Sequence, residues 1–168
     1  MEILALGEKI KRRRKELEMT LKDLAGDRIT PGQISLVESG RSNPSMDLLE
    51  YLANALQTSV EYLMESEETQ AEKISVYYEQ VAESYILAGD YSTGEKYIEN
   101  ALYYVEKYNL EYRKAKILYI RAKIFMAKNE LTLAQQFFLS SNVIFIKNNN
   151  HEEIINTFLN LAESFLKK

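Results

Sequence analysis

The densest group of side chains that could bind a ligand electrostatically is a run of cations near the N-terminus. In the stretch KIKRRRK, residues 9 to 15, six of the seven side chains are Lys or Arg. Residues 1–44 hold nine basic and seven acidic residues, a net charge of +2, whereas residues 65–168 hold twelve basic and fifteen acidic residues, a net charge of −3. A local basic surface can attract a polyanion such as nucleic acid even though the whole chain carries −4. On its own, the run fits a solvated helix face at least as well.

Other chemistries are poorly represented among the side chains. The 168-residue chain has no cysteine, which excludes disulfides, a thiolate nucleophile and a cysteine-based zinc site. Its single histidine, His151, has no second metal-type ligand nearby, and its six glycines form no phosphate-binding loop. We therefore expect no enzyme, no cofactor and no metal site.

The composition favours helices and an aqueous compartment. No apolar run approaches the roughly 18 residues that a membrane span needs, and the N-terminus has no signal-peptide pattern. With six Gly and two Pro in 168 residues, long uninterrupted helices are favoured over a turn-rich β fold. We expect an all-α, cytoplasmic protein without a membrane partner.

Start and stop signals divide the first 64 residues into five short helices. The first is expected from about Leu6 to Glu18, where apolar residues fall on one face. Pro31 stands at the first position of the third helix, where its fixed φ helps and its missing N–H costs nothing, and Gly40 ends that helix. The N-caps predicted for the other four helices are Thr20, Thr30, Ser45 and Ser59.

Five short helices, with a tight turn between the second and the third, are typical of a helix-turn-helix domain. The stretch from Leu6 to Met64 resembles the Cro/repressor-type helix-turn-helix family, also called the xenobiotic-response-element (XRE) family. Its strongest signature, IS..E.G...P, is matched by Ile34, Ser35, Glu38, Gly40 and Pro44.

The resemblance implies that the third helix enters the major groove of double-stranded DNA, with its N-terminal residues against base edges. Gln33 is the expected base reader, because a glutamine can pair bidentately with adenine. Gly32 leaves room for the backbone to approach a phosphate or a base; alternatively, it only loosens a surface turn. The resemblance also implies an internal ion pair between Arg14 and Glu38. The expected DNA contacts are Thr20, Lys22, Arg28, Thr30, Pro31, Gly32, Gln33, Ser35, Leu36, Arg41, Ser42 and Asn43.

The rear of the chain contains an internal repeat of 40 residues. Two segments align without gaps, and the small residues Ala82, Ala122 and Ala162 recur at this spacing. The pattern resembles the tetratricopeptide repeat (TPR), whose usual period of about 34 residues implies longer helices or larger turns here. We expect a DNA-binding domain at residues 1–64, a hinge at 65–73 and TPR-like repeats at 74–168. The third copy contains one helix, either a capping helix or the start of a longer array.

Ten of the 12 tyrosines lie between Tyr77 and Tyr119. Aromatic side chains interleaved with cations could stack on single-stranded nucleic acid, but the helical spacing of these tyrosines favours packing between helices.

The expected fold is thus a five-helix lambda-repressor-like domain followed by a short TPR-like α-solenoid. This layout resembles the peptide-pheromone-sensing regulators of Gram-positive bacteria, the Rap–Rgg–NprR–PlcR–PrgX group. The resemblance implies a homodimeric, quorum-sensing transcription regulator that binds double-stranded DNA at an inverted repeat and a short signalling peptide or a partner protein. The peptide would contact the first helix of each pair, with candidates Glu79, Glu83, Tyr119, Lys123, Asn156 and Asn160. The alternative is a TPR interaction scaffold with weak or non-specific DNA binding.

Overall fold

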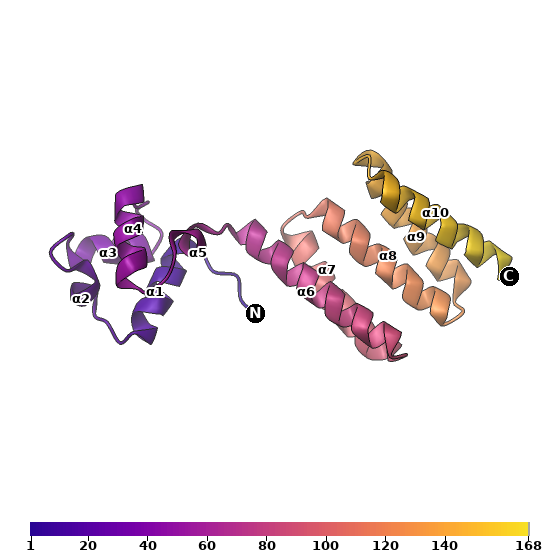
Figure 1. Cartoon of the computed structure of the whole chain (residues 1–168), viewed down its shortest axis with the longest axis horizontal. Coiled ribbons are helices and arrows are strands. Elements are labelled where there is room, and N and C mark those ends of the chain that lie inside the picture. Colours follow the sequence, from indigo (N-terminus) through magenta and orange to yellow (C-terminus); the bar gives the residue numbers. More distant parts are fainter. Residues whose placement is uncertain (168) are drawn as a thin grey trace. The chain divides into compact units, whose positions relative to one another are not determined.

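The computed structural model describes residues 1–167, and every regular element in them is an α-helix (Figure 1). The predicted all-α class is confirmed. The chain divides into two compact units, Met1–Gln70 and the part from Ala71 onward. No helix within residues 1–167 is long and apolar enough to cross a membrane. The helices are α1 (Leu6–Glu16), α2 (Leu21–Ala25), α3 (Pro31–Glu38), α4 (Met46–Ala55), α5 (Val60–Met64), α6 (Glu67–Leu87), α7 (Tyr91–Lys107), α8 (Glu111–Ala127), α9 (Leu131–Lys147) and α10 (His151–Leu166).

The helices of the first unit start where the sequence predicts them to start. The four predicted caps precede α2, α3, α4 and α5, and each hydroxyl accepts a hydrogen bond from the backbone N–H three residues later. The first helix is shorter than predicted, because α1 ends at Glu16 and Glu18 adopts a left-handed conformation with φ of 55°.

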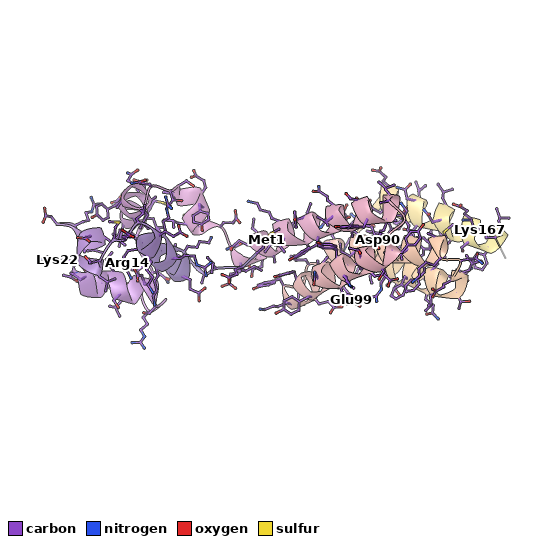
Figure 2. The ribbon with its side chains drawn as sticks, turned by 90° about the horizontal axis from the view of Figure 1, so that it is seen from below. Met1, Arg14, Lys22, Asp90, Glu99 and Lys167 are labelled. Carbon is purple, nitrogen blue, oxygen red and sulfur yellow. The ribbon has the colours of Figure 1, made fainter. Side chains whose placement is uncertain are left out.

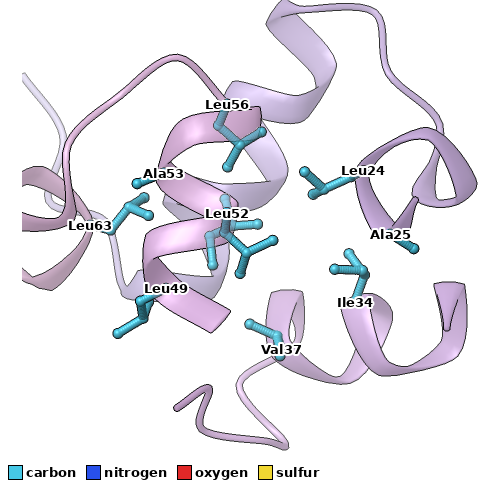
Figure 3. Packing of buried hydrophobic residues seen from close by; sticks show 10 residues of the cluster. Leu24, Ala25, Ile34, Val37, Leu49, Leu52, Ala53, Leu56 and Leu63 are labelled. Carbon is cyan, nitrogen blue, oxygen red and sulfur yellow. The ribbon is translucent and has the colours of Figure 1, made fainter. Parts of the chain in front are cut away.

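A single apolar core joins the five helices of the first unit (Figure 3). Ile10 of α1, Ile34 of α3 and Leu52 of α4 are fully buried in it. Leu24 and Leu63 pack the short helices α2 and α5 against this core. Burial of a large aliphatic side chain stabilises a fold by roughly 1.5–3 kcal/mol, so this core is sufficient to hold two helices of five residues that could not persist alone.

The predicted hinge at residues 65–73 is mostly helical. Helix α6 begins at Glu67, and the boundary between the two units falls after Gln70 rather than after residue 64. Its first turn is capped by Ser66, whose hydroxyl accepts a 3.1 Å bond from Thr69 N. Gln70 then exchanges two hydrogen bonds with the backbone of Leu4, at 2.9 and 3.0 Å. The Ser66 cap is local, whereas the bonds between Gln70 and Leu4 join residues 66 positions apart; both stabilise the start of α6 within the segment expected as a hinge.

The helices of the second unit are joined by four turns of the same construction. One residue of each turn has a positive φ, and these residues recur every 20 positions: Gly89, Asn109, Asn129 and Asn149. In each turn the following N–H bonds back to a carbonyl five residues earlier, as from Glu130 N to Phe125 O at 2.8 Å. The 40-residue repeat therefore consists of two helix-plus-turn halves, and the longer helices expected from this period are present, with 17 residues in each of α7, α8 and α9.

Replacing Asn129 with alanine is expected to lower the free energy of unfolding by about 1 kcal/mol, because an ordinary L-residue is disfavoured in the left-handed region. Asn129→Gly should stay within about 0.5 kcal/mol of the parent, since glycine adopts this conformation freely. Urea denaturation followed by circular dichroism measures both. The control is Asn100→Ala on the exposed face of α7, where alanine should be neutral or stabilising. Equal losses in Asn129→Ala and Asn129→Gly would contradict the explanation from backbone conformation.

The tyrosines of the second unit pack against one another between α6 and α7. The rings of Tyr78 and Tyr104 stack with centroids 6.1 Å apart, and those of Tyr85 and Tyr97 stack at 5.6 Å. The small residue Ala82 lies fully buried beside them. This arrangement agrees with the interpretation of the tyrosines as packing residues.

Candidate nucleic-acid interface

The N-terminal turn of α3 is an exposed surface built around a capping box. The Thr30 hydroxyl accepts a 3.2 Å hydrogen bond from Gln33 N, and Gln33 Oε1 accepts a 3.1 Å bond from Thr30 N. Pro31 occupies the first helical position, as predicted. All residues from Thr30 to Gln33 are exposed, whereas the next residue, Ile34, is fully buried. The first turn of α3 is therefore exposed to solvent, while Ile34 fixes the helix in the apolar core.

The side-chain amide of Gln33 keeps hydrogen-bonding capacity beyond this capping box. The box uses one lone pair of Oε1, which leaves a second lone pair and the two Nε2 hydrogens. Bidentate pairing with adenine needs one acceptor and one donor. Gln33 can therefore cap its own helix and pair with a base at the same time.

Three of the six cations at residues 9–15 form hydrogen bonds inside the first unit, so this run provides less of a local basic surface than its sequence suggests. Lys9 is 2% exposed, and its Nζ donates 2.8 Å bonds to the carbonyls of Tyr62 and Glu65 near the end of α5. Arg13 Nε donates a 2.9 Å bond to the carbonyl of Leu56 at the end of α4. These cations donate hydrogen bonds to backbone carbonyls at helix C-termini, where positive charge is favourable. They are therefore not available to phosphates.

The predicted ion pair between Arg14 and Glu38 is present and ties α1 to α3. Arg14 Nε and Nη2 donate to the two carboxylate oxygens of Glu38 at 2.7 and 3.0 Å, and Nη1 donates to the carbonyl of Met19 at 2.8 Å. The two side chains are 11% and 6% exposed. The hydrogen bond to Glu38 raises the pKa of Arg14. The Arg14 side chain is largely buried in the first unit, whereas Lys22 is exposed at the surface of that unit (Figure 2).

Three cations remain exposed around α3. Lys22 lies on α2, Arg28 lies in the turn before α3, and Arg41 follows α3. The Arg28 guanidinium lies 5.7 Å from the ring centroid of Tyr51, and Tyr51 Oη in turn donates a 2.8 Å bond to the carbonyl of Leu24. These positions suit phosphate contacts on either side of a groove.

The expected uncharged contacts also lie at the surface. Leu36 is 44% exposed on α3, and such an apolar group can contact the methyl group of thymine. Thr20 caps α2 in a box with Asp23, and the hydrogen bond from the Thr20 backbone N–H lowers the pKa of that carboxyl. The uncharged set, exposed throughout, is Thr20, Ser35, Leu36, Ser42 and Asn43.

Sequence reasoning missed Gly7, which sets the approach of α1 to α3. A Cβ atom at this position would lie 2.8 Å from the carbonyl carbon of Glu38 and closer still to the carbonyl oxygens of Val37 and Glu38. The absence of a side chain therefore lets the two helices touch. The signal available in the sequence was a glycine inside a predicted helix, which usually has a packing reason.

The residues expected to bind a peptide lie along α6, α8 and α10, where polar pairs connect these helices. Glu79 is 7% exposed and forms an ion pair with Arg113 of α8, so its carboxylate already has a partner. Tyr119 Oη accepts a 2.8 Å bond from Asn160 Nδ2 of α10. Asn156 lines a small pocket together with Tyr119.

Two further groups complete this surface. Glu83 and Lys123 line one pocket together with the apolar side chains Ile86, Leu87 and Ile120. Sequence reasoning missed Tyr112 and Glu153, which are joined by a 2.7 Å hydrogen bond between α8 and α10. This bond raises the pKa of Tyr112 to about 12 and lowers that of Glu153.

Residues 10–63 match the helix-turn-helix family model. A search of curated proteins gave no match. Among solved structures, the chain is similar to Bacillus thuringiensis PlcR, solved in complex with the peptide PapR7 and DNA. The TM-score is 0.53 at 16% identity, and the alignment covers 96% of this chain and 87% of PlcR. At this identity the likeness concerns the fold. The first finding agrees with the predicted helix-turn-helix domain at the N-terminus, and the second agrees with the predicted fold, in which helical repeats follow that domain.

Proposed function

We propose that this chain, whose residues 10–63 match the helix-turn-helix family model, is a cytoplasmic regulator that reads a specific double-stranded DNA sequence through α3. The observation that carries the proposal is the exposed first turn of α3, with the unused Nε2 donors of Gln33 at its surface. The buried pair of Arg14 and Glu38 holds this turn in place. Base edges in the major groove would face Gln33, while the phosphates on either side would face the exposed cations.

The flanking side chains supply affinity rather than sequence preference. Lys22, Arg28 and Arg41 are exposed, and each phosphate that such a cation neutralises releases a condensed counterion. Three cations imply a salt dependence of log K with a slope of about −3 for one domain, and of about −5 for two. Gly32, which has no atom other than Thr30 Oγ1 within 4 Å of a notional Cβ, leaves the helix backbone open to close approach.

The second unit is proposed to bind a regulatory peptide or protein on the surface formed by α6, α8 and α10. PlcR, whose fold is similar, was solved with a peptide and with DNA. In this chain the surface offers the charged side chains of Glu83 and Lys123 in one pocket with apolar side chains, together with the amide of Asn156 beside Tyr119. An extended peptide could bond to such side chains through its backbone and place its own apolar side chains in the pocket.

The chain is also proposed to act as a homodimer at an inverted repeat, with half-sites about 34–36 Å apart. The second candidate function, an interaction scaffold, is favoured by one observation: Lys9, Arg13 and Arg14 are engaged inside the unit, which lowers the charge available to DNA.

Selection from random double-stranded DNA at physiological salt tests the proposed function. We expect an enriched inverted repeat. A scaffold would show weak, sequence-blind binding that disappears near physiological salt, and that result would overturn sequence-specific recognition.

Replacing Gln33 with glutamate is expected to remove the preference for adenine at one position of each half-site. Glutamate at this position still closes the capping box, so the fold should be retained, but it has no N–H to donate and prefers cytosine. The loss of discrimination should be about 1–3 kcal/mol, measured by binding of matched operator variants.

Two comparisons make this measurement specific. Gln136→Glu on the exposed face of α9 is the same chemical change far from α3 in sequence and should leave the base preference unaltered. Gln33→Ala loses the capping bond as well, and should therefore bind more weakly and melt slightly earlier. An equal loss of affinity for every DNA sequence would show that Gln33 does not recognise a base.

A further inference from the structure

Helices α5 and α6 are connected by only two residues, Glu65 and Ser66. Glu65 has a non-helical backbone, with φ of −58° and ψ of 119°, so the helical path is interrupted there. With no further contacts, the backbone dihedral angles of this connection would be free to rotate. Side chains from other parts of the first unit bond around it instead. We call the two connecting residues, together with Lys9, Gln70 and Leu4, the α5–α6 joint.

Lys9 reaches the joint from α1 with a buried ammonium group. The residue is 2% exposed. Its Nζ donates a 2.8 Å bond to the carbonyl of Tyr62, inside α5, and another of 2.8 Å to the carbonyl of Glu65, beyond the end of α5. Nζ also lies 5.1 Å from the ring centroid of Tyr62. One side chain therefore fixes the end of α5 and the first connecting residue at the same time.

Gln70 fixes the other side of the joint. Its Nε2 donates to the carbonyls of Leu4 and Glu65 at 2.9 and 3.0 Å, and its Oε1 accepts a 3.0 Å bond from Leu4 N. Both Nε2 hydrogens are thereby used, and so are both lone pairs of the Glu65 carbonyl, which also accepts from Lys9. These bonds tie the first turn of α6 to α1, α5 and the N-terminal segment, all within the first unit.

Stability alone does not account for a lysine at position 9. An apolar side chain of similar length could fill the same space, and replacement of buried charges by apolar groups is often neutral or stabilising. Apolar contacts, however, have no preferred direction. Hydrogen bonds do, so bonds to two separate carbonyls fix where the end of α5 and the residue after it lie. The joint therefore specifies the direction in which α6 leaves the first unit.

We propose that Lys9 and Gln70 are positioning residues that hold the first turn of α6 in one orientation on the DNA-binding unit and thereby restrict the half-site spacing that the regulator accepts. Helix α6 is uninterrupted from Glu67 to Leu87 and passes into the second unit after Gln70. Through this helix, a fixed joint limits the positions that α3 can reach from the rest of the chain. This step rests on the proposed function, because it requires two copies of α3 at an inverted repeat.

Distances between two spin labels test the joint without DNA, and the absence of natural cysteines makes the labelling specific. Glu50→Cys on α4 and Glu68→Cys on α6 are exposed sites within the first unit. Labelled chain diluted with unlabelled chain reports only distances within one molecule. The parent should give a single narrow distance distribution, because the joint holds the first turn of α6 in one orientation.

Two conservative variants should broaden this distribution. Lys9→Met keeps the apolar stem but loses both bonds to carbonyls. Gln70→Glu keeps the shape of the side chain and a favourable charge near a helix start, but its carboxylate cannot donate to the carbonyls of Leu4 and Glu65. Lys11→Met and Gln80→Glu, the same changes at exposed positions, are the matched controls and should leave the distribution narrow. A narrow distribution in both joint variants, or equal broadening in the controls, would overturn the proposal.

The spacing of half-sites separates positioning from a purely structural role. One base pair more or less between the half-sites shifts one of them by roughly 3.4 Å and turns it by roughly 35°. The parent should prefer one spacing over its neighbours by roughly tenfold or more, and both joint variants should reduce this preference to less than roughly threefold. Their base preference should stay that of the parent. Weaker binding at every spacing alike would indicate a purely structural role and overturn the proposal.

The two measurements also separate this proposal from the proposed function. If no DNA motif is enriched but the label distances respond as expected, the proposed function fails, and the role of the joint in fixing α6 stands. If a motif is enriched and both joint variants keep the spacing preference of the parent, Lys9 and Gln70 are not positioning residues, and the proposed function stands.

Discussion

Replacing Arg14 with leucine is expected to lower the free energy of unfolding of the first unit by about 3–5 kcal/mol. The substitution leaves the carboxylate of Glu38 unpaired in a place where its side chain is 6% exposed. It also removes the 2.8 Å bond that satisfies the carbonyl of Met19. Native-state hydrogen exchange of amides in α3 and α4 measures the change in the full chain, without interference from the second unit.

The double variant Arg14→Leu/Glu38→Leu isolates the unpaired charge as the cause. Replacement of both partners of a buried pair by apolar residues is often neutral or stabilising, so the double variant should recover most of the loss. Arg12→Leu is the matched control: Arg12 pairs with Glu2 at 2.6 Å, but both side chains are at least half exposed, and such pairs contribute little. A double variant as unstable as Arg14→Leu would show that the guanidinium contributes mainly through packing.

Replacing Gly7 with alanine is expected to cost about 3 kcal/mol, the upper end of the range for overpacking. The new Cβ would overlap the backbone carbonyls of Val37 and Glu38, and a backbone atom cannot rotate away as a flexible side chain can. To remove this overlap, α1 must move away from α3, and that movement also stretches the hydrogen bonds from Arg14 to Glu38. Thermal unfolding and hydrogen exchange of α3 should both report the loss.

Gly32→Ala is the matched substitution with the opposite expected sign. A Cβ at Gly32 meets Thr30 Oγ1 at 3.9 Å and no other atom within 4 Å, and alanine has the higher helix propensity by about 1 kcal/mol. The variant should be more stable than the parent and should bind operator DNA more weakly if the backbone of α3 approaches a phosphate or a base. Increased stability with unchanged DNA binding would indicate that Gly32 only loosens a surface turn.

The predictions that held came from local patterns. Each cap in the first unit acts over three residues, as the hydroxyl of Thr30 does with Gln33 N. The turns between the helices of the second unit, which the sequence analysis did not predict beyond Gly89, also close over five residues, around Gly89 and the asparagines that follow it at 20-residue spacing. In the segment predicted as a hinge, residues 65–73, the start of α6 is stabilised both by the local Ser66 cap and by the hydrogen bond from Gln70 to Leu4, 66 positions away in the sequence.

The electrostatics of the candidate site could not be predicted from the sequence, and the DNA contacts themselves stay predictions. The resemblance to the helix-turn-helix family placed Gln33 on an exposed turn, and the structure agrees. The cations of residues 9–15 look alike in the sequence, yet Lys9 is buried against carbonyls 53 and 56 residues away while Lys11 is exposed. Which lysine reaches those carbonyls depends on the packing of α1 against α5, and no local pattern records it.

The sequence by itself therefore determined where the helices begin, which family the first unit resembles and how the repeat is spaced, because these depend on bonds between near neighbours. The tertiary structure alone decided that Lys9 is buried, that Gly7 permits contact between α1 and α3, and that Gln70 bonds to Leu4. The physical reason is range: capping and turn bonds close within five residues, whereas burial is set by segments that meet after many residues of intervening chain.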